Sequence, residues 1–424
     1  MPKIQGKHVY FFAEQQIEFA FCNSLNTFIK NLYPQIKSEL IYSREPRSNN
    51  YNIDSFIESF DRACEVEHTS FWKDGMWREG FTIRNILNAI RKIFPSAIRL
   101  RRELNKFRFQ SNSIAFLFSG ISLNKALLLR RIKGDSNIKS VLITSPDLVM
   151  NKTESEDFFL HRSRSSFLNF HLYFFGTAFL DVYWLKTPEG IRTNWREFYY
   201  RKKPADYVFE AIYPYRYKRL NKQQLFIPLF NLSKKTKILS NKTLIFIGQP
   251  HFWIEPYSSD IQKIFYLRLN EIIFLIKKKH PLHRLIYKRH PSENDQKFKR
   301  INTKGFEIES SISSESLFIK DPSITALYAF CSASVQTASC FGISSYYIYN
   351  LFDDLNLNIP ETYIRQRSYR FCSEIHPEMN IKSIDDWMDG KNDYKPQDVK
   401  EKVYNSTLRM LEKVGTLESV PEKN

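Results

Sequence analysis

The most informative residues for chemistry lie in the second half of the sequence, where Lys288, Arg289, His290 and Pro291 follow a short apolar run. A histidine N–H and two cations can form charge-assisted hydrogen bonds with a phosphate oxygen. Other His-Pro pairs, one of them at His280, lack an adjacent apolar run with two cations. The sequence therefore predicts a phosphate-binding group at residues 288–291, and the alternative is a turn with a surface histidine.

Small polar residues border two further apolar runs. Ser332 and Ser334 stand ahead of a further apolar run, and their hydroxyls could bind a phosphate together with free backbone N–H groups at a helix start. Gly248 and Gln249 end the run that begins at Thr243, where they can contact a sugar or a base. These residues complete the predicted ligand site, although Ser-rich helix starts are also common without a ligand.

A carboxylate at a strand end is the candidate proton acceptor. Glu189 stands in Lys186-Thr-Pro-Glu-Gly190, after an apolar run at 178–185. Such a group can accept a proton from an attacking hydroxyl, whereas a solvated turn is the alternative. Asp74 and Glu79, in an aromatic and charged segment, compete for the role.

Strand and helix patterns alternate through the first half of the chain. Apolar runs predict strands at 8–12, 39–42, 113–118, 140–144 and 178–185, and helices at 16–32, 82–107, 122–133 and 156–175, with a helical piece at 55–64. Continuous apolar strands between helices indicate a parallel sheet covered on both faces.

The second half repeats the pattern, with strands at 243–250 and 284–288 around a helix at 259–280. Ligands of such sheets bind beyond the carboxyl ends of the strands, where the polar residues above are placed. We expect an α/β protein of the GT-B type, with two Rossmann-like domains facing across a cleft. The predicted parts are an acceptor-side domain, a linker, a nucleotide-sugar domain and a terminal helix, at 1–210, 211–242, 243–395 and 396–424.

The charge balance favours an acidic partner. The sequence has 63 Lys and Arg against 45 Asp and Glu, a formal net charge of +18. Nucleic acid, anionic lipid and anionic polysaccharide all fit such a surplus, and a solvated basic surface is the alternative. A zinc-finger spacing, an RNP-type aromatic motif and a basic leucine zipper are all absent from the sequence, which argues against nucleic acid.

The cysteines and the hydropathy indicate the compartment. Five cysteines without a Cys-x-x-Cys pair are typical of reduced thiols in an intracellular protein. We find no signal-peptide pattern and no uncharged run of the ~18–20 residues that a membrane span needs. We expect a cytoplasmic protein, peripheral at the inner face of an inner membrane.

The motif order resembles that of bacterial sialyltransferases, in particular the capsular polysialyltransferase and lipooligosaccharide sialyltransferase groups. Those enzymes carry a D/E-D/E-G motif, an HP motif and a paired Ser/Thr motif, and the resemblance spans roughly residues 178–345. It implies that His290, Ser332 and Ser334 hold the phosphate of a CMP donor. Pro188 replaces the first acid of the first motif, and the serines are spaced Ser-x-Ser.

The resemblance implies transfer of sialic acid, or a related nonulosonic acid, from its CMP-activated form to a hydroxyl of a capsule or lipooligosaccharide glycan. The donor is a substrate, and we expect neither a metal nor another cofactor. The expected partners are this donor, an anionic glycan or glycolipid acceptor and an anionic membrane surface. Two alternatives stay open, namely a GT-B transferase that uses another nucleotide sugar and a catalytically decayed capsule-assembly protein.

Glu189→Gln is predicted to abolish transfer and to preserve CMP binding, because Gln keeps the shape of the side chain and removes its basicity. We expect Glu189 to face the cleft across from His290. A turnover assay with the CMP-activated donor, run beside a CMP-binding measurement, tests this. Near-normal turnover of the variant would move the role to Asp74 or Glu79.

Overall fold

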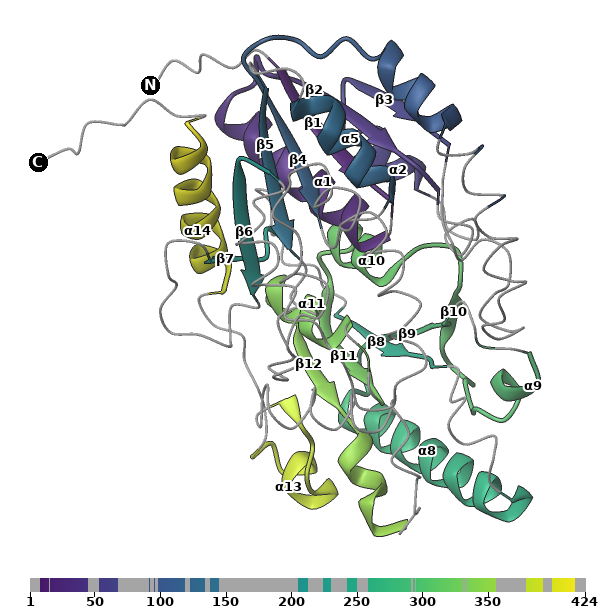
Figure 1. Cartoon of the computed structure of the whole chain (residues 1–424). Helices are drawn as coiled ribbons and strands as arrows, with labels where there is room; N and C mark the ends of the chain where they lie inside the picture. Colours follow the sequence, from purple (N-terminus) through teal and green to yellow (C-terminus); the bar gives the residue numbers. More distant parts are fainter. Residues whose placement is uncertain are drawn as a thin grey trace, which may run out of the picture. The chain divides into compact units, whose positions relative to one another are not determined.

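The computed structural model describes much of the chain, which forms two compact units (Figure 1). The described residues are 8–14, 16–44, 53–67, 91, 95, 98–118, 123–133, 138–144, 205–212, 224–229, 242–249, 258–290, 293, 295–330, 332, 334–355, 379–391 and 399–415. The first unit comprises Met1–Ile212, Arg219–Pro228 and Asn405–Asn424, and the second comprises Tyr213–Lys218 and Leu229–Tyr404.

The first unit contains a seven-stranded parallel sheet in the order β3-β2-β1-β4-β5-β6-β7. The strands are β1 (His8–Ala13), β2 (Lys37–Tyr42), β3 (Arg62–Glu65), β4 (Ser113–Phe118), β5 (Ile138–Thr144), β6 (Tyr207–Ile212) and β7 (Gln224–Phe226). The labelled helices are α1 (Gln16–Leu32), α2 (Asp54–Ile57), α5 (Leu123–Lys133) and α14 (Val399–Val414). Every residue of β1 and β4 is buried, as expected for central strands covered on both faces.

The second unit contains a five-stranded parallel sheet in the order β10-β9-β8-β11-β12. The strands are β8 (Thr243–Ile247), β9 (Arg284–Lys288), β10 (Glu307–Glu309), β11 (Ile324–Ala329) and β12 (Ser344–Tyr347). The helices are α8 (Ser259–Lys279), α9 (Asp295–Phe298), α10 (Ser314–Lys320), α11 (Ser334–Cys340), η4 (Tyr349–Leu355) and α13 (Ile384–Met388).

The strand order reverses once in each sheet, between β1 and β4 in the first and between β8 and β11 in the second. Open α/β sheets bind ligands at such a reversal, because the connections leave the two strand ends in opposite directions and open a crevice. The predicted α/β class with two Rossmann-like domains is confirmed by these sheets.

The structure corrects several of the predicted elements. Arg62–Glu65, placed in a helical piece, forms strand β3, and its half-exposed residues give no apolar signal. Ala211 and Leu225, placed in the linker, pair between β6 and β7 of the first sheet. The predicted strand at 178–185, the helix at 156–175 and much of the helix at 82–107 lie outside the described residues.

The predicted terminal helix exists as α14, and its residues from Asn405 onward belong to the first unit. The backbone N–H of Phe226 donates to Ser406 Oγ at 2.9 Å, and Lys139 Nζ donates to the Val414 carbonyl at 2.9 Å. This helix therefore covers β5 to β7 and is not a separate tail.

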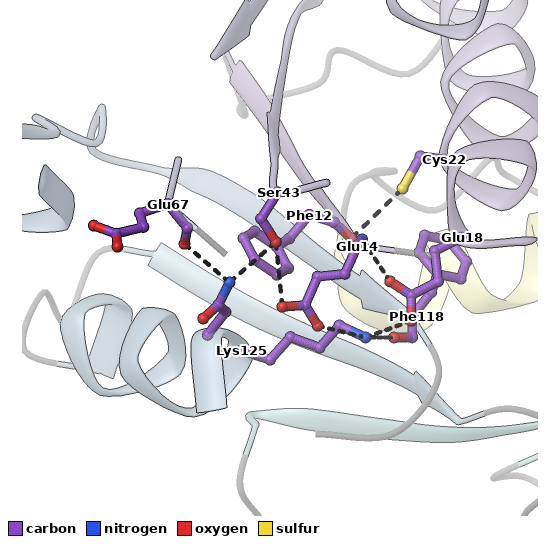
Figure 2. Close-up of polar contacts among 9 residues, drawn as sticks. Phe12, Glu14, Glu18, Cys22, Ser43, Glu67, Phe118 and Lys125 are labelled. Carbon is purple, nitrogen blue, oxygen red and sulfur yellow. Dashed lines mark hydrogen bonds and ion pairs between the residues drawn. The ribbon is translucent and has the colours of Figure 1, made fainter. Parts of the chain in front are cut away.

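A buried ion cluster lies at the carboxyl ends of β1 and β4 (Figure 2). Lys125 of α5 donates to Glu18 Oε1 of α1 at 2.5 Å and to the carbonyl of Phe118, which ends β4, at 2.7 Å. The Glu14 carboxylate lies 3.7 Å from the same ammonium, and the Glu14 N–H donates to Glu18 Oε2 at 2.8 Å. Burial raises the pKa of Glu18, and the charge of Lys125 opposes this increase. The cluster ties two helices to two central strands.

Lys125→Met is predicted to destabilise the protein by about 3–5 kcal/mol at pH 7, because it leaves the Glu18 carboxylate buried without a cation. Lys30→Met, which breaks the more exposed pair with Asp61, should cost about 1 kcal/mol or less. Urea unfolding measures both. The loss of unfolding free energy in Lys125→Met should become smaller as pH falls. Glu18 has a raised pKa in the folded state, so its carboxylate takes up a proton at a higher pH in the folded protein than in the unfolded chain. Equal costs for the two variants would contradict a structural role for the cluster.

Candidate functional site

Neighbouring strands of the second sheet bring the predicted ligand residues to one edge. Ala329 of β11 pairs with Ile247 of β8, and Ile247 pairs with Lys288 of β9, so the three strands end in one row. Gln249 and His290 each lie two residues beyond this row, and Ser332 lies three residues beyond it. Since adjacent strands are about 4.8 Å apart, the row spans about 10 Å.

Lys288 ends β9 as a buried cation. It is 3% exposed, and its Nζ donates to the Arg289 carbonyl at 2.9 Å. Burial lowers the pKa of Lys288 to about 8, although the carboxylates of Glu309, Glu315 and Glu293 act in the opposite direction. The ammonium is therefore charged at neutral pH, in surroundings where an added anion would stabilise it.

His290 follows as a half-buried imidazole. Burial and the positive charge of Lys288 lower its pKa to about 4, so the ring is neutral at neutral pH. A neutral imidazole has one donor and one acceptor nitrogen. His290 can therefore donate a single hydrogen bond to a phosphate oxygen, and Lys288, among the described residues of this turn, can add positive charge.

Arg289 is engaged within the turn that follows β9. Its Nη2 donates to the Glu293 carbonyl at 2.9 Å and to Asp295 Oδ1 at 2.5 Å, and its guanidinium lies 4.7 Å from the centre of the Phe298 ring. Arg289 was predicted to bind the ligand, and in this structure it joins the turn to α9. Pro291 lies outside the described residues.

Glu293, which the sequence analysis missed, fixes this turn against β8. Its buried carboxylate accepts from the Tyr287 hydroxyl at 2.7 Å and from the His290 N–H at 3.4 Å. A Cβ added to Gly248 would lie 2.6 Å from Glu293 Oε2 and 2.6 Å from the Tyr287 hydroxyl. Gly248 also donates its N–H to the Lys288 carbonyl at 2.8 Å. A larger residue would force Glu293 or Tyr287 to move, so Gly248 has a packing role beside its predicted ligand contact.

The predicted serines lie in a hydroxyl network with α10. Ser332 Oγ accepts from the Ser334 N–H at 3.2 Å, and Ser334 Oγ lies 2.9 Å from Ser314 Oγ. Ser313 Oγ accepts from the Ser316 N–H at 3.1 Å at the start of α10. Ser314 was missed because it lies on a different helix, and the Ser-Ser spacing at 310–316 is the signal that could have identified it.

The predicted proton acceptors, Glu189, Asp74 and Glu79, lie outside the described residues. Within the part of the chain that the structure describes, we find no group of three or more His, Cys, Asp or Glu side chains arranged to hold a metal. Likewise, none of the described helices is long and apolar enough to cross a membrane.

Phosphate binding is predicted to weaken as pH rises through about 8 and above. The pKa of Lys288 is about 8 in the free protein, so the ammonium loses its charge in this range. His290 should add no pH dependence between about pH 6 and 9, being neutral throughout that range. Calorimetric titration with CMP from pH 7 to 10 tests this above the second phosphate pKa of about 6. Lys288→Met should bind weakly at every pH, and a flat profile for the unsubstituted protein would exclude Lys288 from the site.

Comparison with known proteins shows likeness at the level of fold. No protein-family model and no curated protein sequence matches this chain. The structure of LpCGTa in complex with UDP is similar with a TM-score of 0.50 and 10% identity, covering 98% of this chain and 100% of that chain. The glycotransferase of kitacinnamycin has a TM-score of 0.45 with 10% identity, covering 98% and 100%. The GT-B domain of a sialyltransferase from Photobacterium damselae has a TM-score of 0.42 with 10% identity, covering 80% and 90%. The chain has the GT-B fold expected from its sequence.

Proposed function

We propose that this protein is a glycosyltransferase that moves sialic acid, or a related nonulosonic acid, from a CMP-activated donor to a hydroxyl of a bacterial surface glycan. The observation that carries the proposal is the row of strand ends at β11, β8 and β9, where Ser332, Gln249, Lys288 and His290 follow one another at one edge. The edge lies at the strand-order reversal of the second sheet, where α/β proteins bind nucleotides.

The charge at this edge favours one phosphate over two. Lys288 is charged at neutral pH, and His290 is neutral. The guanidinium of Arg289 already binds Asp295 and the carbonyl of Glu293. In this proposal Lys288 supplies the positive charge beside His290. A nucleoside monophosphate leaving group matches this charge better than a nucleoside diphosphate does.

The chain's own residues have separate tasks in the proposed reaction. As the bond from the sugar to CMP breaks, negative charge grows on the phosphate, and the Lys288 ammonium and a His290 N–H stabilise it. The hydroxyls of Ser332 and Ser334 add hydrogen bonds to the other phosphate oxygens. Glu189 takes the proton of the acceptor hydroxyl. No metal or further cofactor takes part in this scheme.

The proposed acceptor is an anionic capsule or lipooligosaccharide glycan, reached at the inner face of an inner membrane. The formal net charge of +18 supports both parts of this proposal, because a basic protein is attracted to anionic glycans and to anionic lipid headgroups.

A thermal-shift panel of CMP, UDP, GDP and CMP-sialic acid tests the donor. A ligand of the native state raises stability by mass action, about 2.7 kcal/mol at a hundredfold excess over Kd, so CMP and CMP-sialic acid should stand out. A larger shift with UDP or GDP would favour a transferase of another nucleotide sugar. CMP binding without turnover would favour a decayed capsule-assembly protein.

His290→Ala is predicted to remove most of the CMP shift in this panel. His280→Ala is the control. His280 follows the last residue of α8, and its Nε2 lies 2.7 Å from the Tyr328 hydroxyl, so this histidine has a structural role outside the candidate site. It should lower the melting temperature of the free protein and leave the CMP shift in place. Equal loss of the CMP shift in both variants would mean that His290 acts through folding.

A further inference from the structure

Helix α8 is apolar on two opposite faces. One face packs into the second unit through six buried residues, namely Phe265, Tyr266, Leu269, Ile272, Ile273 and Ile276. On the other face Ile264, Leu267 and Phe274 are 47%, 59% and 65% exposed. A surface helix normally turns polar residues to water, and an exposed apolar stripe marks an interaction site.

The exposed apolar residues lie along one side of α8, where the exposed Glu271, paired with Arg268, interrupts them between Leu267 and Phe274. Positions 264, 267 and 274 differ by three and seven residues, which places them on one side of the helix over about 15 Å. Leu282, just beyond the end of α8, is 88% exposed and extends the apolar surface. We call these four side chains the α8 stripe.

Lysines flank the α8 stripe. Lys263 and Lys278 are exposed beside it, and the last turn of α8 also contains Lys277 and Lys279. The helix has two acidic residues, Asp260 and Glu271, and Glu271 is paired with Arg268 at 3.0 Å. Lys277 and Lys279 donate to the carbonyls of Lys304 and Trp387, so the exposed lysines of the stripe are Lys263 and Lys278, one near each end.

We propose that the α8 stripe docks on an anionic lipid surface, with its apolar side chains among the acyl chains and its lysines at the headgroups. This rests on the membrane association in the proposed function and assigns a surface to it. The combination of apolar and basic residues is what peripheral membrane helices use. A second copy of the chain fits less well, because a twofold contact would bring Lys263 and Lys278 against like charges.

Docking through this stripe is compatible with catalysis. Helix α8 starts after the carboxyl end of β8 and returns to the amino end of β9, so its last turn and Leu282 lie at the opposite edge of the sheet from the candidate site (Figure 1). The far part of the stripe, at the last turn of α8 and Leu282, can therefore approach a membrane while the strand ends at Gly248, Lys288 and Ala329 stay uncovered.

Vesicle co-sedimentation tests the assignment. The full chain should sediment with vesicles of phosphatidylcholine mixed with phosphatidylglycerol, and much less with phosphatidylcholine alone. The double variant Leu267→Ser/Phe274→Ser should bind the mixed vesicles about tenfold or more weakly. Lys263→Glu/Lys278→Glu should also weaken binding, and added salt should weaken binding of the unsubstituted protein.

The matched control is Ile98→Ser, which replaces a side chain that is 49% exposed in the first unit and should bind like the unsubstituted protein. Because all these positions are exposed, the variants should keep their melting temperatures and their CMP shifts. Absence of vesicle binding by the unsubstituted protein would overturn the membrane association itself. Unchanged binding by Leu267→Ser/Phe274→Ser would overturn the α8 assignment alone. Loss of a dimer by that variant in light scattering would identify the stripe as a self-association surface and overturn the proposal.

Discussion

The hydrogen bond between the Tyr287 hydroxyl and the Glu293 carboxylate, packed against Gly248, is the constraint on which the candidate site depends. It holds the turn after β9 against the end of β8 and so fixes where His290 and Lys288 can lie. Because the pair is buried, loss of either partner would leave an unsatisfied polar group at a cost of about 1–3 kcal/mol. Any side chain larger than hydrogen at position 248 would force these groups apart. The precision of the site therefore comes from residues that need not touch the ligand.

Burial has opposite consequences in the two units. In the first, Lys125 is surrounded by Glu18, Glu14 and the Phe118 carbonyl, so its charge is balanced within the protein and serves the fold. In the second, burial lowers the pKa of Lys288 to about 8 although the carboxylates of Glu309, Glu315 and Glu293 oppose this decrease, and Lys288 Nζ donates to the Arg289 carbonyl. A cation held in this way gains more from an incoming anion than a solvated lysine would. The position of Lys288 at the end of β9, two residues before His290, is the basis for proposing it as a ligand-binding residue, whereas Lys125 is enclosed by Glu18, Glu14 and the Phe118 carbonyl.

Local patterns in the sequence were enough to predict β1, β2, β4, β5, β8 and β9 and the longest helix. The run at 113–118 is apolar after Ser113 and forms β4, and helix α8 ends next to Pro281 as its pattern indicated. Strands β3, β6, β7, β10, β11 and β12 were not predicted, and β3, β7 and β10 are only three or four residues long, which is too short for a periodic pattern to show. Glu293 and Ser314 were missed for a related reason: their importance depends on strand register and on contacts between elements, which single-sequence periodicity does not contain.

Hydrogen–deuterium exchange with and without CMP tests the central claim most directly. The claim is that the nucleotide binds where β8, β9 and β11 end. CMP should then slow exchange of the backbone amides of Gln249, Arg289 and Ser334 and leave those at the corresponding edge of the first sheet, such as Glu14 and Ser43, unchanged. Protection confined to Glu14 and Ser43, with no change at the three amides of the second unit, would contradict the account.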